Sequence, residues 1–388
     1  MQKFLSDFSG AALSAGLLSA FVGFAGSFAV VVQGLSSVGA TPLQAASGLM
    51  AAAVAMGLCG VVLSVWLRQP ISVAWSTPGA AFLATLAVPE GGFAVAVGAF
   101  LVAGALIVLA GVWAPLGRAV TAIPRPIASA MLAGVLLPLC LAPFQAIAAF
   151  PWIGLPVVLT WVVMARIKRL LAVPAAVLIA SVLIAMTVDI VGIQHAAWSG
   201  PVWIMPAFSL AGITGIALPL FVITMASQNI TGIAVLGTYG YRPDAGTMFR
   251  WTGAFCLLSA PFGSHGINLA AITAAICAGE EAHPDPARRY WAAIVAGLAY
   301  ALFGLTAGLA VAFMSVAPPI LIAAVAGLAL LGALATSLIS AVETPRDREA
   351  ALVTFLVTAS GLTFFGIGGA FWGLLAGGAL YLWDHRAA

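Results

Sequence analysis

The 388-residue chain is poor in charge, because Asp, Glu, Lys and Arg make up only 6% of its residues, against about 25% in a typical soluble domain. Hydrophobic residues make up 63%, and the mean hydropathy is +1.16. A soluble core cannot bury that much apolar surface, so most of the chain is predicted to lie in a lipid bilayer. The net charge of +3 gives no basis for binding nucleic acid.

Cysteine is also scarce, and the four thiols lack the spacing of metal ligands. All four lie in apolar stretches, where a thiol behaves as a small buried hydrophobe: Cys59, Cys140, Cys256 and Cys277. No HExxH motif or Cys/His set occurs in the sequence, so we predict no metal, no cofactor and no enzymatic centre. The apolar run after Gly10 is longer than the core of a signal peptide and predicts a first membrane span.

Apolar runs of about 20 residues are long enough to cross a bilayer as a helix. Eleven full-length candidates lie near residues 11–33, 42–66, 91–114, 126–143, 146–165, 171–190, 208–236, 287–314, 318–341, 349–364 and 366–383. Two further stretches, 69–89 and 250–280, are apolar but interrupted by polar residues, Gly and Pro. We predict that the first crosses once and the second twice, which gives fourteen spans.

Basic residues support this count, because cytoplasmic loops are enriched in Lys and Arg. With fourteen spans, every basic residue lies on one side of the membrane: Lys3, Arg68, Arg118, Arg125, Arg166, Lys168, Arg169, Arg242, Arg250, Arg288, Arg289, Arg346, Arg348 and Arg386. The opposite loops hold only Glu90, Asp189 and His195 as ionisable residues. A single crossing by 250–280 would move Arg288 and all later arginines outside, whereas a re-entrant hairpin would preserve the parity and stays as an alternative. Both termini are predicted to be cytoplasmic.

The second interrupted stretch is too short to cross the membrane twice as helix. Two crossings of a core about 30 Å thick need about 60 Å of chain. The residues between Arg250 and Glu280 supply only about 43 Å at the helical rise of 1.5 Å per residue. Part of this stretch is therefore predicted to be extended, which at membrane depth requires that it be buried in protein or line a cavity.

The two interrupted stretches also resemble each other. In the first, Ser76-Thr77-Pro78 predicts a helix start with Thr77 as N-cap. Superposing the stretches aligns three pairs of similar residues: Trp75 with Phe262, Thr77 with Ser264, and Gly79 with Gly266. As spans three and ten they stand seven apart, and a repeat with an odd number of spans is inserted upside down. We predict an all-α polytopic membrane protein with two inverted repeats of seven spans, 1–200 and 201–388, in which spans three and ten are each an extended stretch plus a half-helix.

Inverted repeats with paired broken helices are typical of secondary transporters, whose binding site lies where the breaks meet. The N-terminus of each half-helix presents unpaired N–H groups and a positive dipole end, which favours an anion. Polar side chains at membrane depth are costly and usually functional. The candidates on spans one, three, eight and ten are Gln33, Ser76, Thr77, Thr224, Ser227, Gln228, Asn229, Thr231, Ser264, His265 and Asn268. Hydrogen bonding between helices and capping of helix ends are the alternatives for them.

Three further features belong to the predicted site. Phe24, Trp75 and Phe262 are aromatic candidates, with plain packing as the alternative. His265 is the only histidine predicted at membrane depth, and an unperturbed pKa near 6.5 would allow it to titrate at physiological pH. No Asp or Glu lies near the middle of any span. His265 is therefore the candidate for proton coupling, whereas a neutral hydrogen-bonded histidine, a peripheral acid or the substrate itself are the alternatives.

Three segments carry a resemblance to a known family: Ile223–Gly232, Tyr239–Pro243 and Ala260–Ile276. They resemble the benzoate/proton symporter (BenE) family, which is related in fold to the uracil/xanthine and sulfate permeases. The resemblance implies a core domain of spans one to four and eight to eleven, a gate domain of spans five to seven and twelve to fourteen, and an elevator-like movement of the core. It also implies a bacterial inner-membrane location, with a homodimer left open.

The resemblance further implies import of benzoate or a similar aromatic carboxylate with a proton. The carboxylate would accept hydrogen bonds from Thr77, Ser264 and Asn268. The ring would lie against Trp75, Phe262 and Phe24, and the polar side would be closed by Gln228 and Asn229. Alternatives are a carrier or channel for another small anion, of the sulfate-permease kind, and a nucleobase permease. Uracil-type relatives carry carboxylates on spans eight and ten, and this sequence lacks them there, which argues against a nucleobase as substrate.

Overall fold

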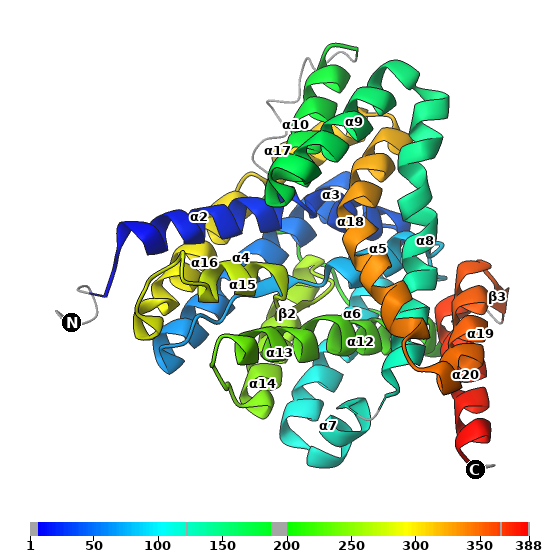
Figure 1. Ribbon diagram of the computed structural model, residues 1–388. Coiled ribbons are helices and arrows are strands. Elements are labelled where there is room, and N and C mark those ends of the chain that lie inside the picture. Colours follow the sequence, from blue (N-terminus) through cyan, green and yellow to red (C-terminus); the bar gives the residue numbers. More distant parts are fainter. Residues whose placement is uncertain (1–6, 122, 188–199, 365–366, 387–388) are drawn as a thin grey trace.

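The computed structural model describes residues 7–121, 123–187, 200–364 and 367–386, which are mostly helical (Figure 1). Asp189 and His195, predicted in the outer loops, lie outside the described residues. Six described helices are long and apolar enough to cross a membrane: Gly10–Ser37, Pro42–Leu67, Phe93–Val112, Arg125–Ala149, Leu210–Thr238 and Pro319–Val342. The pair Pro286–Gly304 and Ala307–Val316, bent by 53°, makes a seventh if it is one span. The chain is therefore a polytopic membrane protein.

The elements follow one another in two series. Before residue 188 these are α2 (Gly10–Ala25), α3 (Phe28–Ser37), α4 (Pro42–Leu67), β1 (Val73–Trp75), α5 (Thr77–Ala84), α6 (Phe93–Val112), α7 (Ala114–Thr121), α8 (Arg125–Ala149), α9 (Pro151–Ile167), η1 (Arg169–Leu171) and α10 (Ala172–Ala185). After residue 199 they are α11 (Leu210–Gly212), η3 (Ile213–Ala217), α12 (Leu218–Thr224), η4 (Met225–Asn229), α13 (Ile230–Thr238), α14 (Ala245–Ser259), η5 (Ala260–Phe262), β2 (Ile267–Leu269), α15 (Ile272–Ala278), η6 (Pro286–Arg288), α16 (Tyr290–Gly304), α17 (Ala307–Val316), α18 (Pro319–Val342), η7 (Pro345–Asp347), α19 (Arg348–Ala359), β3 (Thr363–Phe364), β4 (Ile367–Gly368) and α20 (Gly369–Arg386).

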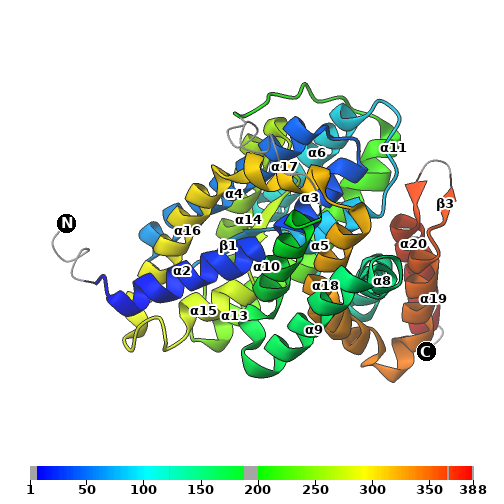
Figure 2. The ribbon, with the colours of Figure 1, turned by 90° about the horizontal axis from the view of Figure 1, so that it is seen from above.

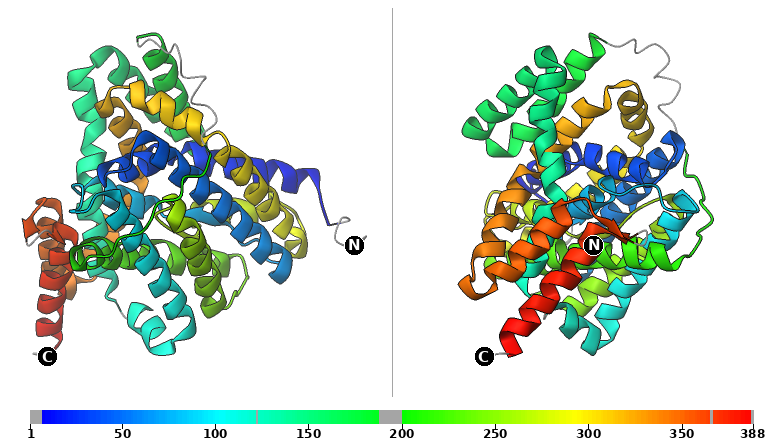
Figure 3. Two further views of the ribbon diagram at one scale, coloured as in Figure 1. Left: turned by 180° about the vertical axis from the view of Figure 1, so that it is seen from behind. Right: turned by 90° about the vertical axis from the view of Figure 1, so that its right-hand side faces the viewer.

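The helices pack in two groups that lie side by side (Figure 2). In one group α4 packs on α16, α6 on α14, and α2 on α16, around the crossing of β1 and β2. In the other group α8 packs on α18 and α19, α9 on α10, and α19 on α20. Residues 200–209 run along the surface of the first group (Figure 3). This segment is held there by the N–H of Ile204 donating to Pro261 O at 2.7 Å and that of Ala207 donating to Ala94 O at 2.9 Å.

Both predicted breaks contain extended backbone, and the two extended pieces are hydrogen-bonded to each other. Strand β1 pairs antiparallel with β2, with Ala74 opposite Asn268. Beyond the strands, the N–H of Ser76 donates to Gly266 O at 3.2 Å, and that of Ala270 donates to Ser72 O at 3.0 Å. The crossing thus satisfies buried backbone groups that could not find water in a bilayer. The predicted extended stretch within 250–280 is confirmed.

Two details of the predicted breaks are wrong. The N-cap of α5 is Ser76, whose Oγ accepts from the N–H of Gly79, and Thr77 is the first helical residue. The predicted alignment also fails for its three pairs, Trp75 with Phe262, Thr77 with Ser264 and Gly79 with Gly266. Each strand leads into its own half-helix, and Trp75 ends its strand as Leu269 ends the other. Phe262 lies earlier, in the 3-10 turn η5.

Glycine allows α4 and α16 to approach closely, and this predicts a large difference between two glycines of α4. A Cβ on Gly57 would overlap the backbone oxygen of Gly297, whereas a Cβ on Gly60 would lie 3.5 Å from its nearest neighbour, Ile71 O. We expect Gly57→Ala to lose about 1–3 kcal/mol of stability through overpacking. Gly60→Ala, the control, should gain up to about 1 kcal/mol from helix propensity. Thermal denaturation in detergent measures both; equal midpoints would contradict the packing argument.

Candidate functional site

Ser76 is fully buried and is the point where both broken spans and α12 meet. Its hydroxyl lies 2.9 Å from the hydroxyl of Thr224 and accepts from the N–H of Gly79 at 3.2 Å. Its carbonyl oxygen lies 2.9 Å from Nε2 of His265, and its N–H donates to Gly266 O. Ser76 therefore caps the half-helix α5 and also bonds it to His265 and Gly266 of the second break.

Unsatisfied polar atoms gather immediately before and within β2. Seven buried side-chain oxygen or nitrogen atoms of the described residues lack a hydrogen-bond partner, and three belong to residues 264–268: Ser264 Oγ, His265 Nδ1 and Asn268 Oδ1. These three side chains are at most 1% exposed. Leaving a buried polar atom without a hydrogen bond costs about 1–3 kcal/mol, so these three atoms are candidates to bind water or another polar group.

Asn268 was predicted to donate a hydrogen bond to the substrate, but in the structure its donor group is already bonded. Its Nδ2 already donates to Leu269 O at 2.8 Å, which leaves the acceptor Oδ1 as the unpaired atom. Gly266 has φ of +155°, a conformation that favours glycine, at the turn from His265 into β2. Gly79 allows α5 to approach α12, because a Cβ there would lie 2.6 Å from the side chain of Leu220.

The helix running from Leu210 to Thr238 contacts both broken spans through two polar side chains. Thr224 bonds Ser76, and Oδ1 of the fully buried Asn229 accepts from the N–H of Leu269 at 2.9 Å. Residues five apart point about 140° apart on a regular α-helix. The π-turn η4 between these two residues is wider, and it brings both side chains nearer to one face.

For the other polar candidates, no side-chain hydrogen bond joins the described residues to the opposite break. The Ser227 hydroxyl donates to Ile223 O of its own helix at 2.6 Å, and Gln228 is half-buried beside it. Thr77 is half-buried at the start of α5. Gln33 is half-buried on α3, with an unpartnered Oε1. Helix α3 packs closely on α5, because Gly34 faces the backbone oxygen of Ala80.

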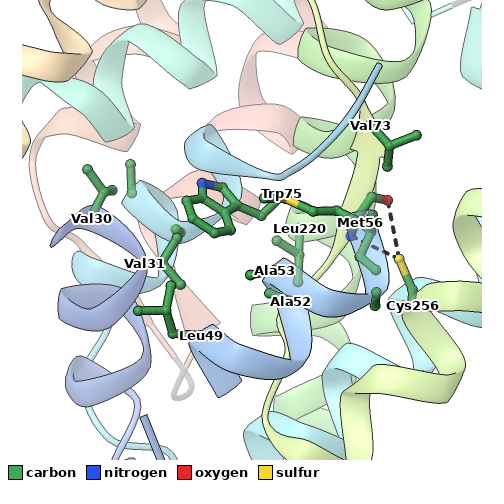
Figure 4. Packing of buried hydrophobic residues seen from close by; sticks show 14 of the residues in the cluster. Val30, Val31, Leu49, Ala52, Ala53, Met56, Val73, Trp75, Leu220 and Cys256 are labelled. Atoms are coloured by element: carbon green, nitrogen blue, oxygen red, sulfur yellow. Dashed lines mark hydrogen bonds between the residues drawn. The ribbon is translucent and has the colours of Figure 1, made fainter. Parts of the chain in front are cut away.

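An aromatic group adjoins the polar residues through Trp75, the residue before Ser76. Figure 4 shows the Trp75 side chain among apolar residues, with Val30 and Val31 of α3 beside it. Its ring centroid lies 5.4 Å from that of Phe24, which stacks on Phe28 at 5.9 Å and meets Phe303 edge-on at 5.5 Å. Phe262 instead packs on Trp203, at 5.4 Å. The structure therefore brings Phe24 to Trp75 and gives Phe262 a different partner.

Two contacts at the breaks were not predicted. Nε1 of Trp75 donates to the hydroxyl of Ser27 at 2.8 Å, and the hydroxyl of Ser72 lies 2.9 Å from that of Thr273. Ser27 lies in the short gap between α2 and α3. The Gly26-Ser27 pair was the feature of the sequence that could have indicated this interruption of the first span. The Ser72–Thr273 pair joins residues 201 positions apart and had no local signal.

Two solved transporters share this fold. The murine Solute Carrier 26 family member A9 anion transporter, in the inward-facing state, superposes with a TM-score of 0.62 at 14% identity, over 97% of this chain and 68% of that chain. The transmembrane domain of the cyanobacterium bicarbonate transporter BicA superposes with a TM-score of 0.57 at 15% identity, over 97% and 96% of the two chains. The chain therefore shares its overall helical fold with these two solved proteins.

The chain belongs to the BenE family, described as benzoate membrane transport protein, whose family model matches residues 6–382. It is 42% identical over 376 residues to the inner membrane protein YdcO of Escherichia coli (strain K12), covering 95% of each chain. It is 33% identical over 379 residues to the benzoate membrane transport protein of Acinetobacter baylyi (strain ATCC 33305 / BD413 / ADP1), covering 97% of this chain and 95% of that one. The protein is a membrane transporter and not an enzyme.

Proposed function

We propose that this transporter imports benzoate or a similar aromatic carboxylate together with a proton across the bacterial inner membrane. The observation that carries the proposal is the junction of two groups at adjacent residues. Trp75 belongs to an aromatic group, and Ser76 bonds the polar segment that contains Ser264, His265 and Asn268. A ring with a small polar head matches both groups. The name of the Acinetobacter baylyi relative supports benzoate.

Fourteen spans with cytoplasmic termini are part of the proposal. Asp7 accepts from the hydroxyl of Tyr290 at 2.9 Å. The same carboxylate lies 3.8 Å from Nη1 of Arg68 and 3.5 Å from Nε of Arg288. The N-terminal segment and the segments after α4 and α15 therefore meet at one end of the molecule. This supports an even number of crossings between Arg68 and Arg288, as the positive-inside argument requires.

We propose that the two groups of packed helices are a core domain and a gate domain. In the proposal, the group around β1 and β2 is the core domain, and the group around α8 and α18 is the gate domain. The crossing ties spans three, eight and ten by hydrogen bonds through Ser76, Thr224 and Asn229, so these spans would move as one body. An elevator-like shift of that body past the gate domain is the movement we propose.

Uptake into proteoliposomes tests the substrate. We expect labelled benzoate to accumulate when the lumen is more alkaline than the medium, and unlabelled benzoate to compete. Sulfate, bicarbonate and uracil should not compete. Protein-free liposomes under the same gradient are the control, because uncharged benzoic acid crosses bilayers unaided.

The second candidate is a carrier for a small inorganic anion, which is favoured by the likeness in fold to anion and bicarbonate transporters. Under that hypothesis sulfate or bicarbonate, and not benzoate, would be taken up and would compete in the same vesicles. Uptake of uracil would instead support the nucleobase permease.

A further inference from the structure

The hydrogen bond between His265 and Ser76 decides which ring nitrogen holds the proton. Nε2 lies 2.9 Å from a carbonyl oxygen, and a carbonyl oxygen only accepts. Nε2 must therefore carry the hydrogen. In the neutral ring the other nitrogen, Nδ1, is then a bare acceptor, and it is the buried atom without a partner.

The elements packed around His265 supply no charge to the ring. The sequences of α4, α5, α6 and η4 contain no Asp, Glu, Lys or Arg. Helix α14 carries Arg250, which is half exposed and lies 4.0 Å from Asp244. The titratable thiols on these elements are Cys59 and Cys256, and the Cys256 thiol is bonded to the backbone of Ile267. Within these elements, a proton on Nδ1 would have no anionic partner.

A carboxylate anion alone is a poor match for these atoms. Its two oxygens only accept hydrogen bonds, whereas two of the three unpaired atoms, His265 Nδ1 and Asn268 Oδ1, are themselves acceptors and only the Ser264 hydroxyl can donate. A carboxylic acid has one O–H donor and one carbonyl acceptor. The O–H complements Nδ1, and the carbonyl oxygen complements the Ser264 hydroxyl.

We infer that the site takes up a carboxylate and one proton as a single neutral unit, with the proton shared between the substrate oxygen and Nδ1 of His265. This inference rests on the proposed function and adds the form in which the substrate is bound. The proton lies either on oxygen, beside a neutral ring, or on Nδ1, beside a carboxylate. In both forms the substrate and His265 together have no net charge, so neither partner is buried as an isolated ion.

The inference predicts one proton taken up for each benzoate bound. With wild-type protein in weakly buffered detergent solution near pH 7, adding benzoate should raise the pH by the equivalent of one proton per bound molecule. The apparent Kd should rise about tenfold for each unit of pH increase over a range of about pH 6.5–8. Binding without proton uptake, or a Kd independent of pH, would overturn the inference.

Neutral analogues test the hydrogen-bond pattern without any titration. Benzamide offers an N–H donor and a carbonyl acceptor in the shape of benzoic acid. Nitrobenzene has nearly the same shape but only acceptor oxygens. We expect benzamide to displace labelled benzoate from the wild-type protein at concentrations at least about tenfold lower than nitrobenzene. Equal or better displacement by nitrobenzene would contradict a site that contains an unpaired acceptor.

A histidine variant assigns the proton to one atom. His265→Gln retains an amide that can donate to Ser76 O but cannot bind a proton. Proton uptake on benzoate binding should therefore fall from one to zero if the proton lies on Nδ1, and should stay at one if it lies on the substrate oxygen. His283→Ala, which removes a histidine from the exposed loop after α15, should retain an uptake of one proton. Proton uptake that persists in His265→Gln would assign the proton to the substrate oxygen, whereas wild-type binding without proton uptake would overturn the inference. If that variant does not fold, the wild-type measurements and the analogue comparison still decide the inference.

The outcomes separate this inference from the proposed function. Benzoate that binds and accumulates with no proton uptake, and is displaced equally by both analogues, would leave a benzoate carrier but remove the shared proton. Absence of benzoate binding and uptake across about pH 5–8, with another anion transported, would remove the proposed substrate itself.

Discussion

Replacing Trp75 by alanine is expected to lower the free energy of unfolding by about 3–5 kcal/mol, the range for truncating a large buried aromatic residue. The Trp75 side chain is 1% exposed and packs against Phe24 and the apolar residues of α3 and α4. Its Nε1–H donates to Ser27, so truncation also removes a buried hydrogen bond. The fraction of protein that stays monodisperse after heating in detergent measures the loss.

Trp383→Ala is the matched control for that experiment. This side chain, on α20, is 75% exposed. Its truncation should therefore change little the temperature at which half of the protein is no longer monodisperse. Trp75→Phe keeps an aromatic ring and removes only the N–H donor and part of the packing, and it should lie between the two. If Trp75→Ala were as stable as Trp383→Ala, Trp75 would not be the packing centre of the first break.

Replacing Asn229 by leucine is expected to lower the rate of benzoate uptake per folded protein molecule, and not only the amount of folded protein. Leucine is similar in size but leaves the N–H of Leu269 buried without an acceptor, a loss of about 1–3 kcal/mol. Since that N–H belongs to β2, the segment that contains Asn268 should shift relative to α12. Initial rates of benzoate uptake, normalised to folded protein in the vesicles, should fall at least about tenfold.

Thr231→Val tests whether any polar loss on this helix has the same effect. Thr231 is two residues further along, is exposed, and its hydroxyl bonds Ala226 O of the same helix, at 3.3 Å. Its replacement should leave uptake within about twofold of wild type, because a hydroxyl bonded within its own helix contributes little. Equal losses in both variants would contradict a special role of Asn229 in holding β2.

The main feature of the fold that could be predicted was the presence and place of the two breaks. Chain length alone required extended backbone between Arg250 and Glu280, and β2 is there. The position of the first helix start was predicted within one residue. Thr77 and Ser76 both have a hydroxyl suited to capping, and the choice between them depends on the backbone bond from Ser76 to Gly266, which is not visible in local sequence.

For the candidate site, the sequence indicated residues but not which of their atoms are already bonded and which are unpaired. Asn229 and Asn268 look alike in sequence, yet one uses Oδ1 to hold Leu269 whereas the other leaves Oδ1 unpaired. The π-turn that brings Thr224 and Asn229 nearer to one face has no compositional signal, because its bonding pattern depends on contacts with the two breaks. The alignment of Trp75 with Phe262 failed because similarity over five residues does not determine the register of two strands.

The crossing of β1 and β2 also has a consequence for how the protein is made. The bond between Ser76 and His265 joins residues that are 189 positions apart. At a synthesis rate of about 5–20 residues per second, the first break waits about 10–40 s for its partner. Throughout that interval its backbone N–H and C=O groups lack the bonds they make in the finished protein. The first half of the chain must therefore stay near the insertion machinery, or in contact with water, until the second half arrives.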